Sequence, residues 1–227
     1  MKNDNKKTNK IILIVCIIAI ISILGIWGIS AYLTDTDTAT NQFVVGQVKI
    51  ELKEPSWESA TDSDGNGIPD YAENVVPNDT IQKDPQIKNI GNNSAYVYLK
   101  VNVPAKKVVV ANNDGTLINE GNPTNTQLFT YNINNDWKEI VSARKENLNS
   151  SNEVESYTYV YYYDKALGVN ETTTALFNTV TFANLVEGQA ELGSYQIDLN
   201  AYAIQSENLP NGTTIEGAYA IYMNQNG

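Results

Sequence analysis

Histidine is absent from the chain, and the single cysteine, Cys16, lies within a hydrophobic run near the N-terminus. Without histidine, no Ser-His-Asp or Cys-His nucleophile can be assembled, and zinc sites built from histidine or several cysteines are excluded as well. One cysteine forms no intramolecular disulfide, so the hydrophobic core alone must hold the folded chain together. Among the many carboxylates, no two stand out as an acid/base pair. We therefore expect that the protein is not an enzyme.

Basic residues are also scarce. Lysine and arginine number 15 against 26 aspartates and glutamates, which gives a net charge of -11. Residues 1–31 hold four lysines and only one aspartate, so the excess of negative charge lies in the rest of the chain. An acidic surface repels the phosphates of nucleic acids and anionic membranes. We therefore expect no nucleic acid partner, and a well-solvated surface explains the charge.

A hydrophobic segment near the N-terminus predicts export. Residues 1–10 are rich in lysine and asparagine, and residues 11–29 carry no charge. A basic leader, a hydrophobic segment and a small residue before the cut are typical of a secretory signal peptide. We predict that residues 1–31 are a signal peptide and that cleavage falls between Ala31 and Tyr32.

The same segment is long enough to cross a bilayer as a helix, which takes about 20 residues. An uncleaved N-terminal transmembrane helix is therefore the alternative, and it would be the only part of the chain in contact with a membrane. In both interpretations residues 32–227 reach the outside of the cell. We expect the protein to be secreted, to the extracellular matrix or the cell surface.

Beyond the N-terminal region, hydrophobic and polar residues alternate in several segments, a period typical of β-strands with one buried face. Turn-forming residues separate these segments and no helical period is sustained, which predicts an all-β domain, an antiparallel β-sandwich. Residues 136–148 are the one short helix or irregular excursion that we expect, and residues 215–223 are helical or extended. The clearest strands are expected at residues 42–53, 95–103, 154–163 and 193–205.

One of these strands carries a stripe of tyrosines. The side chains of Tyr157, Tyr159, Tyr161 and Tyr163 share one face of the strand at residues 154–163. Such a stripe most often packs across neighbouring strands of a sheet. The alternative is an exposed surface that stacks on sugars or peptides.

An acidic segment at residues 62–73 matches the calcium-loop pattern D-x-[DN]-x-[DN]-G-x5-E. Calcium prefers oxygen ligands, and a tight loop with a glycine at the sharp turn supplies them from alternate residues. Asp62, Asp64 and Asn66 would supply side-chain oxygens, and Ile68 its backbone carbonyl oxygen. Asp70 would bind directly or through a water, and Glu73 would bind as a bidentate carboxylate. We therefore expect calcium as a cofactor.

The residues around this segment do not form an EF-hand, because residues 57–61 do not read as an entering helix and Pro69 lies within the loop. The segment instead resembles the calcium loops of thrombospondin type 3 repeats, which share the spacing without paired helices. The alternative is a solvated turn of aspartate, asparagine and glycine without a bound ion.

The junction after the hydrophobic segment has a pattern of its own. A small residue, an aromatic residue and an acidic, polar arm are followed by N-x-F-x-x-G-x-(V/L)-x-(I/L)-x-L, here Asn41, Phe43, Gly46, Val48, Ile50 and Leu52. Weaker matches follow in order at residues 75–77, 83–85, 89–91, 95–97 and 201–205. In these features, which cover most of residues 25–205, the chain resembles the TasA/camelysin family of exported proteins.

The resemblance implies a jelly-roll-like sandwich, a SipW-type signal peptidase that removes the signal peptide, and self-assembly into extracellular matrix fibres of biofilms. In that family an N-terminal arm freed by the cut can complete the sheet of a neighbouring protomer. Here the arm would be residues 32–45, and the residues expected to act in assembly are Leu33, Asp35, Asp37, Asn41 and Phe43. The calcium-type loop departs from the family, and the metallopeptidase label given to some members does not carry over to a chain without histidine.

Two functions follow from these observations. The leading hypothesis is an exported structural protein that assembles into extracellular fibres. The alternative is a monomeric, calcium-dependent surface adhesin or ligand-binding β-sandwich that uses its loops or its tyrosines.

Overall fold

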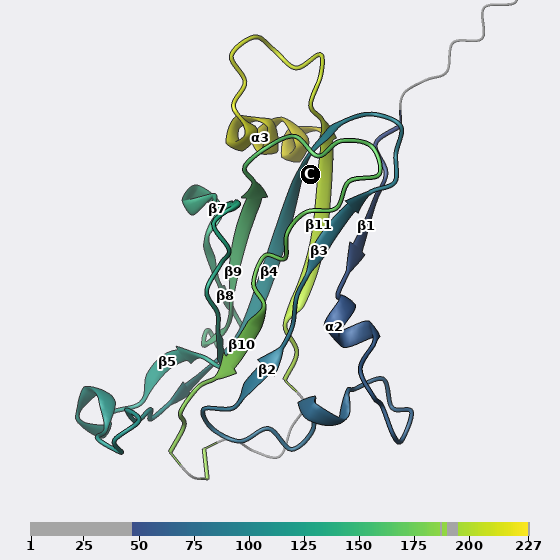
Figure 1. Cartoon of the computed structure of the whole chain (residues 1–227). Helices are drawn as coiled ribbons and strands as arrows, with labels where there is room; N and C mark the ends of the chain where they lie inside the picture. The colour runs from purple at the N-terminus through teal and green to yellow at the C-terminus, as the bar shows by residue number, and fades with distance from the viewer. Residues whose placement is uncertain (1–46, 187, 190–194, 227) are drawn as a thin grey trace, which may run out of the picture. The chain divides into compact units, whose positions relative to one another are not determined.

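The computed structural model describes residues 47–186, 188–189 and 195–226 (Figure 1). The predicted signal peptide, the cleavage position at Ala31 and Tyr32, and the arm residues Leu33, Asp35, Asp37, Asn41 and Phe43 lie outside the described residues. No helix in the described part of the chain is both long and apolar enough to cross a membrane.

The described residues form mostly β-strands, and all pairs of strands are antiparallel. The predicted all-β, antiparallel class is therefore confirmed. The helices are α2 (Pro55–Glu58), α3 (Ile215–Asn226) and three short 3-10 turns, η1 (Asp70–Ala72), η2 (Ile118–Gly121) and η3 (Val141–Ala143). The strands are β1 (Ile50–Lys53), β2 (Thr80–Gln82), β3 (Gln86–Asn89), β4 (Ala95–Val108), β5 (Thr124–Gln127), β6 (Phe129–Thr130), β7 (Trp137–Glu139), β8 (Lys145–Leu148), β9 (Val154–Tyr163), β10 (Thr179–Phe182) and β11 (Asp198–Gln205).

A large sheet is built around the long strand β4, in the order β11-β4-β9-β7, with β8 paired to β9 and β5 paired to the end of β4. The alternation predicted for residues 95–103 sets the two faces of this sheet. Ala95, Val97, Leu99, Val101 and Val103 are completely buried on one of these faces, which we call the inner face. The strand predicted at residues 154–163 coincides with β9.

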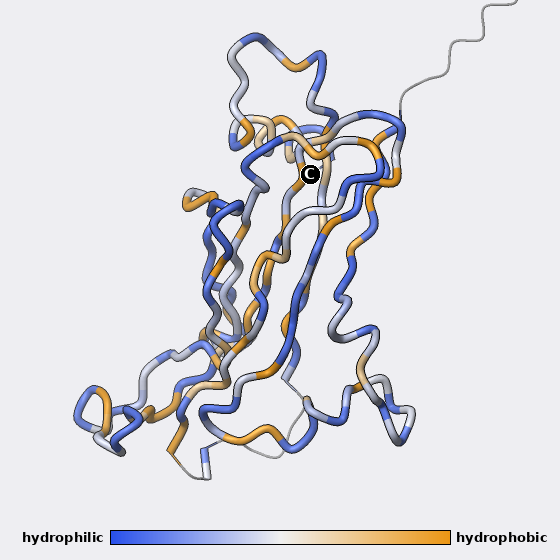
Figure 2. The backbone as a smooth tube through the Cα atoms, viewed as in Figure 1, coloured by the Kyte–Doolittle hydropathy of each residue, from blue (hydrophilic) through white to orange (hydrophobic). Residues whose placement is uncertain are grey.

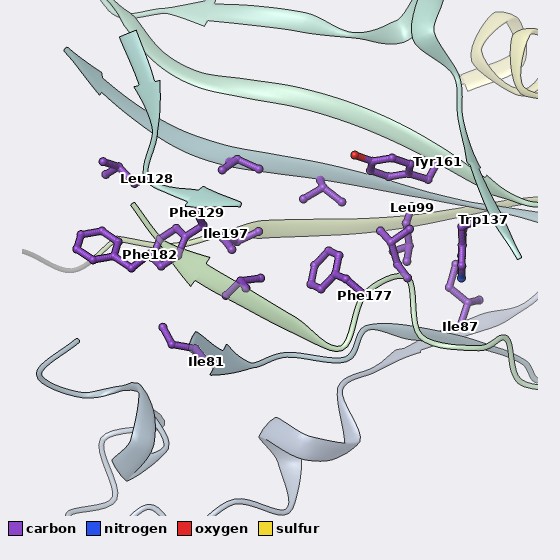
Figure 3. Packing of buried hydrophobic residues seen from close by; sticks show 14 of the residues in the cluster. Ile81, Ile87, Leu99, Leu128, Phe129, Trp137, Tyr161, Phe177, Phe182 and Ile197 are labelled. Carbon is purple, nitrogen blue, oxygen red and sulfur yellow. The ribbon is translucent and has the colours of Figure 1, made fainter. Parts of the chain in front are cut away.

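Two small sheets, β1-β3 and β2-β10-β6, supply the other side of the main core. Ile87 of β3, Ile81 of β2 and Phe182 of β10 belong to the same buried cluster as Leu99 of β4 (Figure 3). Figure 1 shows β10, β2 and β3 in front of the large sheet. Burying a side chain of this size contributes roughly 1.5–3 kcal/mol, so these contacts are the main force that holds the sheets together.

The opposite, outer face of the large sheet is covered by α3 at one end. Tyr98 is completely buried there, packs on Tyr219 of α3 with ring centroids 5.1 Å apart, and donates its hydroxyl to the carbonyl oxygen of Ile215 at 2.8 Å. Burial raises the pKa of Tyr98 well above its ordinary value. Of the two conformations expected for residues 215–223, the structure has the helix.

The helical interpretation of residues 136–148 is wrong. This segment forms β7, the 3-10 turn η3 and β8, which all lie along β9. Trp137 is 1% exposed, and its indole N–H donates to the carbonyl oxygen of Thr174 at 3.0 Å. A helix would not hold the indole in this position while its backbone pairs with Tyr163, so tertiary packing overrides the local propensity.

Candidate functional site

The predicted calcium loop, residues 62–73, is a tight and hydrophilic turn between α2 and β2 (Figure 2). The carboxylate of Asp62 accepts backbone N–H groups from Gly65 at 2.8 Å, Asn66 at 3.2 Å and Gly67 at 2.9 Å. These bonds, that of Gly67 first, hold the pKa of the Asp62 carboxyl below its ordinary value. Gly65 and Gly67 both have positive φ angles, of 72° and 86°, which permit the turn to close around the carboxylate.

Three of the predicted ligands meet directly. The amide nitrogen Nδ2 of Asn66 donates to Oδ2 of Asp64 at 3.0 Å and to Oε1 of Glu73 at 2.6 Å. The remaining carboxylate, Asp70, accepts the N–H and the hydroxyl of Ser63 at 2.8 and 2.6 Å, and the hydroxyl is the main reason that its pKa is lowered.

Ile68 is 37% exposed, and its N–H donates to Oδ1 of Asn66 at 2.7 Å. The loop thus gathers its oxygen atoms by hydrogen bonds of its own. No group of three or more aspartate, glutamate, histidine or cysteine side chains in the described residues is arranged to hold a metal ion. Calcium binding stays a prediction from the sequence.

The base of the loop is fixed to the body. Tyr71 packs edge-on against Trp57 at 6.2 Å, and its hydroxyl donates to the carbonyl oxygen of Gln82 at 3.2 Å. Lys83 forms a half-buried ion pair with Glu54 at 2.7 Å and lies 5.0 Å from the centre of the Trp57 ring. The loop therefore extends from a well-anchored platform formed by α2 and β2.

A second candidate site is the edge of the large sheet at β11. Just beyond this strand, the N–H of Ser206 donates to the carbonyl oxygen of Ser94 at 3.0 Å. Antiparallel neighbours alternate between hydrogen-bonded and non-hydrogen-bonded pairs. Because β11 keeps one register along β4, its even-numbered residues bond to β4. Leu199, Ala201 and Ala203 therefore direct their N–H and C=O groups away from β4.

Within the described residues, no strand pairs with this outward side of β11. The side chains of Leu199, Ala201 and Ala203 face the main core but are only partly buried. On the opposite layer, Ile50 and Leu52 of β1 are also partly buried against the core, and β1 contacts β11 without a hydrogen-bonded ladder. The core therefore reaches the surface where β1 and β11 meet.

Three of the four tyrosines of the β9 stripe, Tyr159, Tyr161 and Tyr163, lie in the main core or pack against it. Tyr161 and Tyr163 are buried at 5% and 3% exposure, and the hydroxyls of Tyr131 and Tyr161 lie 3.0 Å apart. Burial raises the pKa of Tyr161 to about 12. Tyr159 stacks beside Tyr161 and is partly buried against the same core. Cross-strand packing, the first of the two interpretations of this stripe, describes these residues.

Sequence reasoning missed a polar groove on the outer face of the large sheet, beside the part covered by α3. The groove has a volume of about 690 Å³. The alternation of β4 places Lys100 and Asn102 opposite the buried Val101, which is a signal that the sequence carries, but the strands that complete the groove could not be paired from sequence. Its lining residues are Lys100, Asn102, Lys145, Glu146, Asn147, Leu148, Glu155, Ser156, Thr158, Asp198 and Asn200.

Comparisons with known proteins assign no function to these sites. No protein-family model, curated protein or solved structure matches the chain. The resemblance to the TasA/camelysin family therefore depends on the sequence patterns alone.

Proposed function

We propose that this chain is an exported structural protein that assembles with copies of itself into extracellular fibres. In each contact, the N-terminal arm of one protomer, residues 32–45, adds a strand to the edge of β11 in the next protomer. The observation that carries the proposal is the outward side of β11, whose backbone groups have no partner strand among the described residues.

This edge suits strand addition for two reasons. An unpaired edge offers a row of N–H and C=O groups that another extended chain can use. At β11 these groups belong to the residues whose side chains face the core, Leu199, Ala201 and Ala203. An added strand would therefore gain backbone hydrogen bonds and cover partly exposed hydrophobic side chains at the same time.

The finer fold in this proposal is a sandwich with jelly-roll-like connections. Its support is the arrangement of the two small sheets, which share one buried cluster with the inner face of the large sheet. In a sandwich of this kind β1 lies at the open side beside β11, and residues 46–49 separate the arm from β1 in the chain. In the proposal, cleavage decides whether the arm is free to reach a neighbour.

Export makes the arm available. In the proposal, a SipW-type signal peptidase cuts between Ala31 and Tyr32 and releases the arm outside the cell. Before the cut, the arm is joined to the hydrophobic segment at residues 11–29. Asp35 and Asp37 keep the free arm soluble, and Phe43 supplies a large apolar side chain for the partly exposed core. The protein is not an enzyme in this proposal.

Calcium has a structural role in the proposal. Asp62, Asp64, Asn66, Asp70 and Glu73 supply the side-chain oxygens and Ile68 its carbonyl oxygen. The support for the fit is the tight turn that the Asp62 carboxylate holds together, which keeps these residues in one loop. A bound ion would stiffen the loop above the platform of α2 and β2.

The experiment uses the chain that begins at Tyr32 and compares Ala201→Pro with Ala201→Val. Proline removes an N–H that the ladder with β4 does not use, so the body should fold while the edge can no longer pair. Valine keeps the N–H and serves as the matched control. Electron microscopy should show filaments for the unchanged chain and for Ala201→Val, but none for Ala201→Pro.

Two results would contradict the proposal. Filaments of the folded Ala201→Pro variant would show that the edge of β11 is not the acceptor. Filaments of a chain that lacks residues 32–41 would show that the arm is not the donor. A chain that never forms filaments supports the second candidate function, a monomeric adhesin or ligand-binding domain, which the polar groove favours.

A further inference from the structure

We propose that the polar groove on the outer face of the large sheet binds a carbohydrate chain. The groove crosses four strands, β8, β9, β4 and β11, and its side chains stand in register. Asp198, Asn102, Thr158 and Lys145 form one row, because each is the cross-strand partner of the next. Its volume of about 690 Å³ lies within the range of small-ligand sites.

The floor of the groove is neutral, polar and already ordered. Nδ2 of Asn147 donates to Oγ1 of Thr158 at 2.8 Å, to Oγ of Ser156 at 3.1 Å and to Oδ1 of Asn102 at 3.2 Å. The hydroxyl of Thr158 also donates to Oδ1 of Asn102, at 3.1 Å. Ser156 is only 6% exposed. A fixed floor of amides and hydroxyls lowers the entropic cost of binding a ligand.

This network leaves hydrogen-bonding groups free to face the groove. Oδ1 of Asn102 accepts two hydrogen bonds, while the Nδ2 hydrogens of Asn102 and the Oδ1 atom of Asn147 have no protein partner among the described residues. Asn200, exposed on β11, adds a further amide at one end. Donors and acceptors therefore alternate over a short distance, as hydroxyl-rich ligands require.

The charged residues around this floor argue against ionic ligands. Lys100 and Lys145 stand with Asp198 on the outer face, so positive and negative groups are mixed in the groove. A polyanion would meet the carboxylate of Asp198, and a polycation would meet the two lysines. An uncharged polar ligand avoids both penalties and can accept or donate hydrogen bonds to either kind of group.

A peptide is also disfavoured by the position of the groove. Peptides that bind sheets usually pair with a free edge through their backbone. This groove lies on a sheet face, where β4 and β9 already use their backbone groups for each other. Apart from Leu148, its lining offers side-chain amides, hydroxyls and charges, which can form hydrogen bonds with sugar hydroxyls and N-acetyl groups.

The inference goes beyond fibre formation and is tested separately from it. The full chain, held in detergent micelles for its hydrophobic segment, is titrated with chitopentaose and with cellopentaose by calorimetry, without any requirement for assembly. We expect binding of at least one of these neutral pentasaccharides. Asn200→Ala should weaken it by about tenfold, the effect of one lost hydrogen bond in a binding site.

Control variants distinguish a loss of sugar binding from misfolding, and charged probes test whether binding depends on charge alone. Asn125→Ala changes another exposed strand asparagine, outside the groove, and should leave binding unchanged. Thr158→Val keeps the side-chain shape, and unchanged melting with weaker binding would place the sugar on the floor. A heparin pentasaccharide and hexalysine serve as charged probes.

Three results would overturn the inference. The first is the absence of binding to both neutral probes at millimolar concentration. The second is binding that neither Asn200→Ala nor Thr158→Val weakens. The third is tighter binding of a charged probe than of either neutral one.

Discussion

The two faces of the large sheet are built from the same strands, but they differ in nearly every physical respect. The inner face of β4 buries Val97, Leu99 and Val101 against the small sheets. On the outer face, Tyr98 is buried under α3, while Lys100 and Asn102 line the open groove. A β-strand points successive side chains to opposite faces. One run of residues can therefore supply a core for stability and a surface for recognition without interference between the two.

The largest effect should come from the inner face. Leu99 is completely buried at the centre of the main core, so Leu99→Ala leaves a cavity and should lower the free energy of unfolding by about 2–5 kcal/mol. The matched outer-face change, Asn200→Ala, should stay within about 0.5 kcal/mol, because this side chain is exposed. Urea denaturation measures both. Similar losses in the free energy of unfolding for the two variants would contradict the proposed difference between the faces.

A neighbouring pair of tyrosines sharpens the same contrast. Tyr161 lies on the inner face, where its hydroxyl meets that of Tyr131 at 3.0 Å. Tyr161→Phe leaves a buried hydroxyl without its partner and should cost about 1 kcal/mol of stability. Tyr162 points to the outer face, and Tyr162→Phe should cost less. Thermal unfolding followed by circular dichroism gives the comparison, and an equal cost would contradict it.

A smaller effect is expected at the predicted calcium loop, residues 62–73. Millimolar calcium should raise the melting temperature of the chain that begins at Tyr32, because a ligand that binds only the folded state stabilises it. Asp64→Ala should abolish the rise, while Asp114→Ala, in another exposed turn, should preserve it. A melting curve that calcium does not move would count against an ion at residues 62–73.

The smallest expected effect is that of acid, which should change only this loop. The pKa of Asp62 is lowered from the ordinary value of 3.8, chiefly by the N–H of Gly67. A carboxyl with a lowered folded-state pKa stabilises the loop above its unfolded pKa, and this contribution is lost as the pH falls through the folded pKa. Nuclear magnetic resonance should show the amide signals of Gly65 and Gly67 change with a midpoint below pH 3.8. A midpoint for Asp62 above that value would contradict these hydrogen bonds.

Much of the inner face follows from the sequence, because a period of two over residues 95–103 specifies which side chains are buried. The calcium pattern at residues 62–73 is also local, and the structure places it in a tight turn. The path of residues 136–148, in contrast, does not follow from the local sequence. Trp137 is positioned by Tyr163 and Thr174, which are distant in the chain, and no local pattern contains that information.

The two surface sites were hidden from the sequence for the same reason. The groove needs Asp198 beside Asn102 and Thr158 beside Lys145, and these pairings depend on the register of strands far apart in the chain. The proposed acceptor edge depends on which residues of β11 bond to β4, and the hydrogen bond from Ser206 to Ser94 establishes this. Alternation predicts which residues share a face, but only the assembled sheet shows which faces and edges remain open.

The most direct test of fibre formation is amide hydrogen exchange along β11 before and after assembly of the chain that begins at Tyr32. Asn200 and Tyr202 bond to β4 and should be protected in both states. If the arm adds to this edge, the N–H groups of Leu199, Ala201 and Ala203 should exchange quickly in the monomer and become protected in filaments. Unchanged, rapid exchange of these three amides in filaments would contradict strand addition at this edge.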